Sequence, residues 1–395
     1  MATETIATPV VPSRLTWLLL ASIAAYCIAN ATWWLQPVLI DQLMTLRGCT
    51  ASVAGLVVSA EMTTMALTAS ALAKFQKSGR YLTICLVGAF VTIACTYASL
   101  QASSLASLIL TRTGVGLGEG LLLMIANTAM ACFPDPDKAF GRLGTANVVF
   151  GIVLVHALGY FHTQALPAFF TMLVSLCALT PFLLLMPTTA RLRHGEHADS
   201  SASSALQAAV RFRILLLSAS TFFVGVASGV MWSFYAVIGH GTGLSDESVD
   251  GAIATAILSA IVGSGLTAVI GNRWGRIGPV TIALAAMTAA IVALSFHPSG
   301  ATFRVATCIN VASLYFMVPY LFGAGAAQDP SGRGATFVSS AFFMTGAVSP
   351  FLGGLLMDHV GIEFVGIAVI VTSLLAGALF VYVNRPVPAR PPITL

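Results

Sequence analysis

Charged residues are scarce in this chain. Asp, Glu, Lys and Arg together make up 8% of its 395 residues, whereas hydrophobic residues make up 57%, and the mean hydropathy is +0.91. An ordinary soluble domain has about a quarter of its residues charged. So few charges cannot cover a core of this size with a surface that water solvates. The composition therefore excludes a soluble protein and predicts an integral membrane protein.

Other absences narrow the class further. The apolar runs lack the period-two alternation of an outer-membrane barrel, so helices must cross the bilayer, because each helix satisfies its own backbone hydrogen bonds. No phosphate-binding glycine motif is present, which argues against ATP-driven transport. The seven cysteines are scattered and show no metal-ligand spacing. We therefore expect packing roles for the cysteines, and no metal and no cofactor.

A membrane enzyme or receptor is the alternative class. An enzyme needs paired catalytic groups, and the candidates are Asp135 and Asp137 in the segment FPDPDKAF. Pro134 and Pro136 favour a turn there, and Asp137 is expected to cap the helix that follows. A passive channel is a further alternative, which counterflow separates from a carrier because channels show none. The sequence favours a carrier and not an enzyme.

Twelve apolar stretches are each close to the about 20 residues that a hydrocarbon core of about 30 Å requires. They are Trp17–Ile40, Ser52–Ala73, Tyr81–Leu100, Leu105–Phe133, Ala139–Phe161, Leu166–Met186, Phe212–Gly239, Val249–Gly271, Val280–Phe296, Thr302–Ala326, Ala335–Met357 and Phe364–Val383. The first follows a polar leader, Met1–Ser13, without a small-residue cleavage site. We expect it to be a retained helix and not a signal peptide.

The positions of Lys and Arg predict the orientation. If the N-terminus is cytoplasmic, only Arg47 and Arg304 of the 18 basic residues face outward, and Arg112 lies within a span. The positive-inside rule then places both termini in the cytoplasm, and we expect a multi-pass protein of the cell inner membrane. The net charge of +4 reflects this bias and implies no nucleic-acid partner.

One long polar interruption divides the chain. Residues 188–210 are expected to form a flexible cytoplasmic linker between an N-terminal six-helix bundle (1–187) and a C-terminal one (211–395). The loops after the second and eighth spans also match, since KFQKSGR and GNRWGR are both basic and both end in Gly-Arg. Matching loops in the two halves are expected when two bundles face a central cavity with the substrate near the midplane.

These loops resemble the signature of the major facilitator superfamily, Gly-x-x-x-Asp-Arg-x-Gly-Arg. The matching residues are Lys77, Gly79 and Arg80 in the first copy and Arg273, Gly275 and Arg276 in the second, with Leu72 replacing the first Gly, and Gln76 and Asn272 at the Asp position. The segment GAVSPFLGGLLMDHVG also looks like the penultimate helix of that superfamily. The resemblance spans essentially the whole chain. It implies an all-α membrane protein with twelve transmembrane helices in two pseudo-symmetric six-helix bundles.

The fourth span contains two charges at membrane depth, which are costly and therefore informative. Arg112 and Glu119 are seven residues apart, so they share a face and lie about 10 Å apart along the axis. With Gly116 and Gly118 they resemble the fourth-helix motif of proton-coupled organic-anion symporters and spinster-like lipid carriers. The resemblance implies that Glu119 carries the proton and that Arg112 binds an anion or tunes the acid. The alternative is that Arg112 only hydrogen-bonds neighbouring backbone carbonyls and that Glu119 packs in a hydrated space without a functional role.

Two further groups are predicted at a similar depth. Glu61 and Arg112 both lie about 12 Å below the outer surface by residue count, so we expect an ion pair between them. His156 is in a similar layer, and a network of the three is a hypothesis for proton transfer, because His titrates near physiological pH. The alternative for His156 is a neutral side chain bonded to a backbone carbonyl.

The C-terminal half offers aromatic residues instead of buried charge. Candidate substrate contacts are Trp33, Asn127, Trp232, Tyr235, Tyr315 and Tyr320, together with Arg112, and Asn147 is a lesser candidate. Such a site suits a small amphipathic molecule, for instance an aromatic or aliphatic carboxylate with its anionic end toward Arg112. The alternative is that individual rings face lipid or form interfacial belts.

The expected function is secondary transport of a small organic solute, driven by protons and working by alternating access in the lipid bilayer. The fifth span contains Gly144, Gly151 and Gly159 but no proline, unlike drug-proton antiporters of the superfamily, which favours uptake by symport. Efflux by drug or metabolite antiport is the alternative. We expect the protein to act as a monomer.

Overall fold

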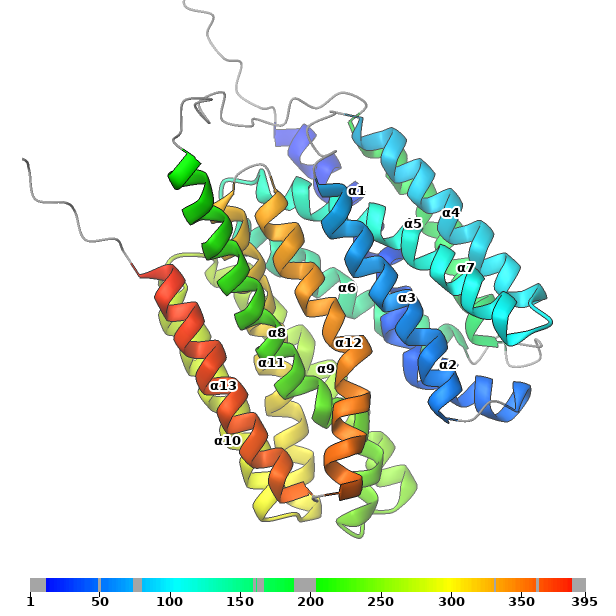
Figure 1. The fold of residues 1–395 in the computed structure, drawn as a ribbon, viewed down its shortest axis with the longest axis vertical. Coiled ribbons are helices and arrows are strands. Elements are labelled where there is room, and N and C mark those ends of the chain that lie inside the picture. Colours follow the sequence, from blue (N-terminus) through cyan, green and yellow to red (C-terminus); the bar gives the residue numbers. More distant parts are fainter. Residues whose placement is uncertain are drawn as a thin grey trace, which may run out of the picture.

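The structure is a computed structural model that describes residues 12–48, 51–73, 80–158, 161, 167–187, 204–329, 332–359 and 362–385. The regular elements within these residues are all helical (Figure 1). They are α1 (Pro12–Ala29), α2 (Ala31–Arg47), α3 (Ala51–Leu72), α4 (Tyr81–Gln101), α5 (Leu105–Ala131), α6 (Pro136–Leu158), α7 (Pro167–Leu179), the 3₁₀ helix η3 (Thr180–Leu185), α8 (Ser204–Gly241), α9 (Asp246–Ile270), α10 (Ile277–Phe296), α11 (Gly300–Gln328), α12 (Arg333–His359) and α13 (Ile362–Asn384).

Ten segments in the described part of the chain are long and apolar enough to cross a membrane. They confirm a multi-pass membrane protein, and helical elements coincide with all the predicted spans. The helices α6 and α12 are not among the ten.

The first predicted span is two helices and not one. Asn30 has non-helical dihedrals (φ −114°, ψ 7°) between α1 and α2, and its side-chain amide donates to the Tyr26 carbonyl at 2.7 Å. A side chain that bonds the local backbone competes with the helical ladder. The break lies next to Thr32, Trp33 and Trp34, and all three contribute to the site described below.

Helix α8 begins within the range predicted for the linker. Residues 188–203 lie outside the described residues, but α8 already begins at Ser204, so residues 204–210 are helical. The loop at 74–79 also lies outside the described residues. Its counterpart at Gly271–Arg276 is described, with Gly271 and Gly275 at positive φ.

The helices gather in two groups in Figure 1. The blue to cyan helices lie to the right and the green to red helices to the left. Across the boundary, α6 packs against α9 and α11, and α12 packs against α3 and α5. Segments far apart in sequence therefore meet along one central interface, where buried polar side chains from both groups lie.

Glycines let α5 approach its neighbours closely. A Cβ on Gly118 would run into the Gly88 carbonyl oxygen and the Thr92 side chain of α4, and one on Gly116 would run into the Glu61 carbonyl of α3. Small residues at such crossings permit backbone-to-backbone packing in membranes. The two glycines of the fourth-span pattern thus bring α3 and α4 against α5.

Gly118→Ala is expected to lower the free energy of unfolding by about 1–3 kcal/mol, because the added methyl overpacks a contact between backbones. Denaturation in mixed micelles of increasing SDS fraction measures this change. Gly265→Ala is the matched control, since nothing lies within 4 Å of a Cβ at that helical position. It should be neutral or stabilising by about 0.5–1 kcal/mol. Equal effects of the two substitutions would contradict the packing role.

Candidate functional site

A fully buried ion pair joins α5 to α3. Arg112 Nε donates to Glu61 Oε2 at 2.7 Å, and Arg112 Nη2 forms the ion pair with the same oxygen. Thr32 of α2 links the pair, because it accepts from Arg112 Nη2 at 2.9 Å and donates to Glu61 Oε1 at 2.6 Å. All three side chains have 0% exposure. The ion pair expected from the residue depths is present.

Glu119 lies beside this pair, and no further cation pairs with it among the described residues. Its Oε1 is 3.4 Å from the Thr32 hydroxyl, and its Oε2 has no hydrogen-bond partner among the described residues. Arg112 Nη1 also has none. With both carboxyls ionised the cluster carries one net negative charge at a buried position, which is costly. A single proton makes the cluster neutral.

The four residues Thr32, Glu61, Arg112 and Glu119 are called the charge cluster below. α7 covers it: the Phe169 ring centroid lies 4.9 Å from Arg112 Cζ, and Met172 Sδ is 4.0 Å from the Thr32 hydroxyl. Phe169 and Met172 are themselves fully buried. These apolar neighbours keep water away and strengthen the electrostatic interactions inside.

His156 does not belong to the cluster, so the three-member network is corrected. Its side chain is exposed, and its Nδ1 lies 2.9 Å from the Ile152 carbonyl oxygen of the same helix. That contact is the local alternative considered from the sequence. Thr32 takes the third place instead. A threonine among apolar residues carries no charge signal, so sequence reasoning missed it.

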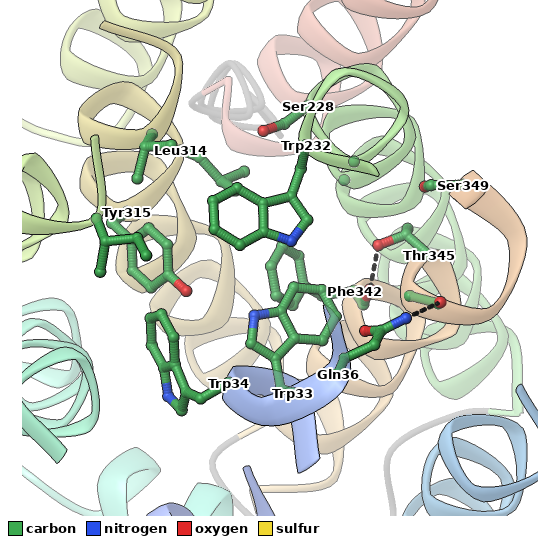
Figure 2. Close-up of a pocket in the computed structure, with 15 residues that line it drawn as sticks. Trp33, Trp34, Gln36, Ser228, Trp232, Leu314, Tyr315, Phe342, Thr345 and Ser349 are labelled. Atoms are coloured by element: carbon green, nitrogen blue, oxygen red, sulfur yellow. Dashed lines mark hydrogen bonds between the residues drawn. The ribbon is translucent and has the colours of Figure 1, made fainter. Parts of the chain in front are cut away.

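A pocket lined by aromatic rings lies between the two groups of helices (Figure 2). It contains about 630 Å³ of empty space, its open mouth included. Its lining is Trp33, Trp34, Gln36, Gly225, Ser228, Gly229, Trp232, Ile257, Val311, Leu314, Tyr315, Phe342, Thr345, Gly346 and Ser349. These residues come from α2, α8, α9, α11 and α12, so both groups of helices build it. The lining contains no Asp, Glu, Lys, Arg or His.

Ring contacts hold the pocket together across the two groups of helices. Trp34 stacks on Tyr315 with centroids 5.9 Å apart, and Trp33 packs against Phe342 at 5.6 Å. In Figure 2 the Trp232 ring lies over this group, and the Tyr315 hydroxyl points toward the two indoles of α2. Gln36, Ser228, Thr345 and Ser349 supply the polar atoms.

Three of the predicted contact residues line this pocket, namely Trp33, Trp232 and Tyr315. The others lie elsewhere. Asn127 donates to Ser339 Oγ at 2.6 Å, Tyr235 accepts from the Asn310 amide, and Tyr320 donates to the Gly271 carbonyl at 2.9 Å. These three are buried and tie helices together.

Arg112 is also absent from the pocket lining, because its guanidinium is buried against Glu61 and Thr32. Contact between Arg112 and an anionic solute therefore stays a prediction that this geometry does not favour. The cluster and the pocket are instead linked through α2, in which Thr32 and Trp33 are consecutive. A movement of α2 affects both sites.

A second pocket lies on the other side of the same rings. It shares Trp33, Tyr315 and Phe342 with the first and is also lined by Asn30 and Asn147, among others. Asn147 is 4% exposed, and its Oδ1 has no partner among the described residues. The three shared side chains thus lie between two neighbouring spaces.

An ion pair also joins the two groups of helices where α6 begins. Arg276 donates to both carboxylate oxygens of Asp137, from Nε to Oδ1 at 2.9 Å and from Nη2 to Oδ2 at 2.9 Å. Asp137 was expected to cap a helix, but α6 begins at Pro136 and the Lys138 amide donates to Asp135 Oδ1 at 3.0 Å instead. Asp137 is therefore free to bind across the interface.

Comparison with known proteins points to one fold. No protein-family model and no curated protein sequence matches the chain. Among solved structures, the superfamily transporter FucP in an outward conformation has a TM-score of 0.75 at 14% identity, over 93% of this chain and 98% of that one. The proton:xylose symporter XylE has a TM-score of 0.78 at 13% identity, over 95% and 96%. The human organic anion transporter MFSD10 has a TM-score of 0.72 at 15% identity, over 94% and 100%.

Proposed function

The chain has the fold of the major facilitator superfamily transporters, and we propose that it is a proton-coupled secondary transporter of a small organic solute. The observation that carries this proposal is the charge cluster, which is one proton short of neutrality. An uncompensated buried charge is costly, so binding and release of a proton change the stability of the helix arrangement around Thr32. Because Trp33 follows directly in α2, the same change reaches the solute pocket.

The roles of the individual residues follow from their contacts. Glu119 is the protonatable group, because one of its oxygens has no partner. Arg112 and Glu61 form the fixed pair that holds it in place. The Thr32 hydroxyl has a single proton, so it can donate to Glu61 or to Glu119 but not to both. Protonation of Glu119 would release Thr32 fully to Glu61.

The proposed architecture is twelve membrane-spanning helices in two six-helix bundles, with both termini in the cytoplasm. The pairs α1–α2 and α7–η3 would each form one span. The excess of Lys and Arg on one side supports an inner-membrane protein of this orientation. The two groups of helices support alternating access, and the Asp137–Arg276 pair would close the end at which it joins them. We propose a monomeric unit.

The pocket supports a solute whose bound part is an uncharged ring. Aromatic walls with a few amide and hydroxyl groups favour apolar surface combined with oriented hydrogen bonds. Because no Asp, Glu, Lys, Arg or His lines the pocket, an isolated charge on the solute would lack compensation there. A carboxylate would need to reach Arg112, which is enclosed. Two of the similar structures are described as symporters of fucose or xylose with protons, which supports symport; drug or metabolite efflux is the second candidate.

Proteoliposomes loaded with a pH-sensitive dye test this function. Solutes are added outside without an imposed gradient, using neutral sugars and a size-matched series of benzamide, benzoate and benzylamine. A symported solute is expected to acidify the lumen, whereas a solute taken up in exchange for protons would make it alkaline. Glu119→Gln is expected to abolish the pH change while leaving exchange of labelled solute intact.

Glu363→Gln is the matched control, because Glu363 is exposed near the start of α13. It should behave as the unchanged protein does. Solute uptake without any pH change, or a pH change that survives in Glu119→Gln, would overturn the coupling mechanism. Preference for benzoate over benzamide would contradict the proposal that the bound solute is uncharged, and would support contact between Arg112 and the solute.

A further inference from the structure

A long groove opens on the side of the molecule, between α3 and α8, with α12 as its floor. It contains about 2110 Å³ of empty space, its open side included. Figure 1 shows α12 lying between α8 and α3, and α12 packs against both of them. The groove is separate from the two central pockets, with which it shares no lining residue.

The groove changes from polar to apolar along its length. Gln207, Arg211, Asp329 and Arg333 line one end, and Phe222, Phe223 and Met344 line the other. From Arg333 to Met344 the floor is about 16 Å long at 1.5 Å per residue. That is about half of a hydrocarbon core of about 30 Å, so the groove has the depth of one leaflet.

Two polar atoms on the floor have no partner. Arg333 Nε and Ser340 Oγ are buried without a hydrogen bond among the described residues, and Ser340 is 4% exposed. Buried polar atoms in native structures almost always have partners. The two residues are seven positions apart, so they share one face of α12, and both line the groove. Their positions match an acceptor-rich ligand that extends along the helix.

The charges at the polar end favour an anion. Arg211 and Arg333 contribute two positive charges there and Asp329 one negative charge, which leaves a net positive charge. Arg211 is exposed and lies near the membrane surface by its position in α8. A phosphate is the anion that membranes provide at this depth, and a guanidinium binds it well because its donors form a planar fork.

We propose that this groove binds an acidic phospholipid of the surrounding leaflet. The phosphate lies between Arg333 and Arg211, an ester carbonyl accepts from Ser340, and one acyl chain runs along Phe222, Phe223 and Met344. The lipid would cover a boundary between the two groups of helices. This inference concerns the membrane-facing surface and does not depend on the transported solute.

The test uses the purified full chain with equal amounts of phosphatidylglycerol and phosphatidylcholine of identical acyl chains. Native mass spectrometry counts the lipids that each protein retains. The unchanged protein is expected to retain phosphatidylglycerol in preference, and Arg333→Gln should reduce that preference about fivefold, as loss of one basic contact at a lipid surface implies. Arg304→Gln is the matched control, because Arg304 is exposed near the start of α11, outside the groove, and should change nothing.

A second variant keeps the experiment decisive if Arg333→Gln folds poorly. Ala341→Trp leaves both arginines in place but fills the groove, so retention of both lipids should fall. Equal retention of the two lipids by the unchanged protein would overturn the proposal, as would an unaltered preference in the variants. A dimer in the spectrum that Ala341→Trp dissociates would assign the groove to a second copy of the chain. Displacement of both lipids alike by an amphipathic solute would assign it to the solute.

Discussion

Arg112→Gln is expected to lower the free energy of unfolding by about 3–5 kcal/mol, which is the usual cost of leaving a buried charge without its partner. The substitution removes the only cation that contacts Glu61 in the described part of the chain, and Glu119 lies beside the same site. Two buried carboxyls would then face one hydroxyl, that of Thr32. Unfolding in SDS-containing mixed micelles measures the loss.

The double variant Glu61→Gln with Arg112→Gln separates pairing from packing. Once both partners are neutral, no uncompensated charge remains in the pair, and Glu119 can become neutral by taking up a proton. The double variant is therefore expected to be more stable than Arg112→Gln alone, by at least about 1 kcal/mol. Glu363→Gln, at an exposed position, should cost less than about 0.5 kcal/mol. A double variant no more stable than Arg112→Gln would count against the pair.

Arg276→Gln is expected to open the end of the molecule that the Asp137–Arg276 pair closes. The pair is bidentate, with 16% exposure of the arginine and 0% of the aspartate side chain. Truncating one partner of such a pair costs about 2–5 kcal/mol, largely because the other charge stays buried. A change of only one or two kcal/mol already shifts a two-state ratio by a factor of about 5–30. The variant should therefore populate a conformation in which the two groups of helices have separated there.

Spin labels at the exposed positions Arg142 and Trp274 report this opening, after replacement of the seven native cysteines. A longer distance should appear in the variant and be absent from the parent. The reversed pair, Asp137→Arg with Arg276→Asp, should restore the short distance. Arg273→Gln is the matched control, because Arg273 is an exposed arginine of the same turn. Identical distance distributions in Arg276→Gln and the parent would show that this pair does not hold the end closed.

Much of the fold is predictable from the sequence because lipid is a demanding solvent. Each crossing segment must be apolar over a set length, so each one can be recognised from its own residues without knowledge of the others. The helices therefore coincide with the predicted spans, with differences where local chemistry intervenes. Asn30 divides the first span into two helices. At the other boundary, α8 begins at Ser204, seven residues before the predicted end of the linker.

The depth of a charged residue along its helix can also be predicted from the local sequence, because it follows from counting residues at a constant rise. That is why the Glu61–Arg112 pair was predictable. Which side chain completes a cluster depends on the rotation and crossing of neighbouring helices, which hydropathy does not record. His156 was predicted at a suitable depth, but its ring contacts a carbonyl of its own helix. Thr32, in the first turn of α2, contacts both members of the pair.

The order of apolar and charged residues along the chain determined that this protein resides in a membrane and which segments are apolar enough to cross it, because the bilayer imposes those properties on each segment separately. Only the tertiary structure decided the partners. It enclosed Arg112 away from the aromatic pocket, turned Asp137 toward Arg276, and placed Trp33, Trp232 and Tyr315 around one space. The physical reason is that a pocket or an ion pair between distant segments requires close packing of whole helices, which no single segment determines by itself.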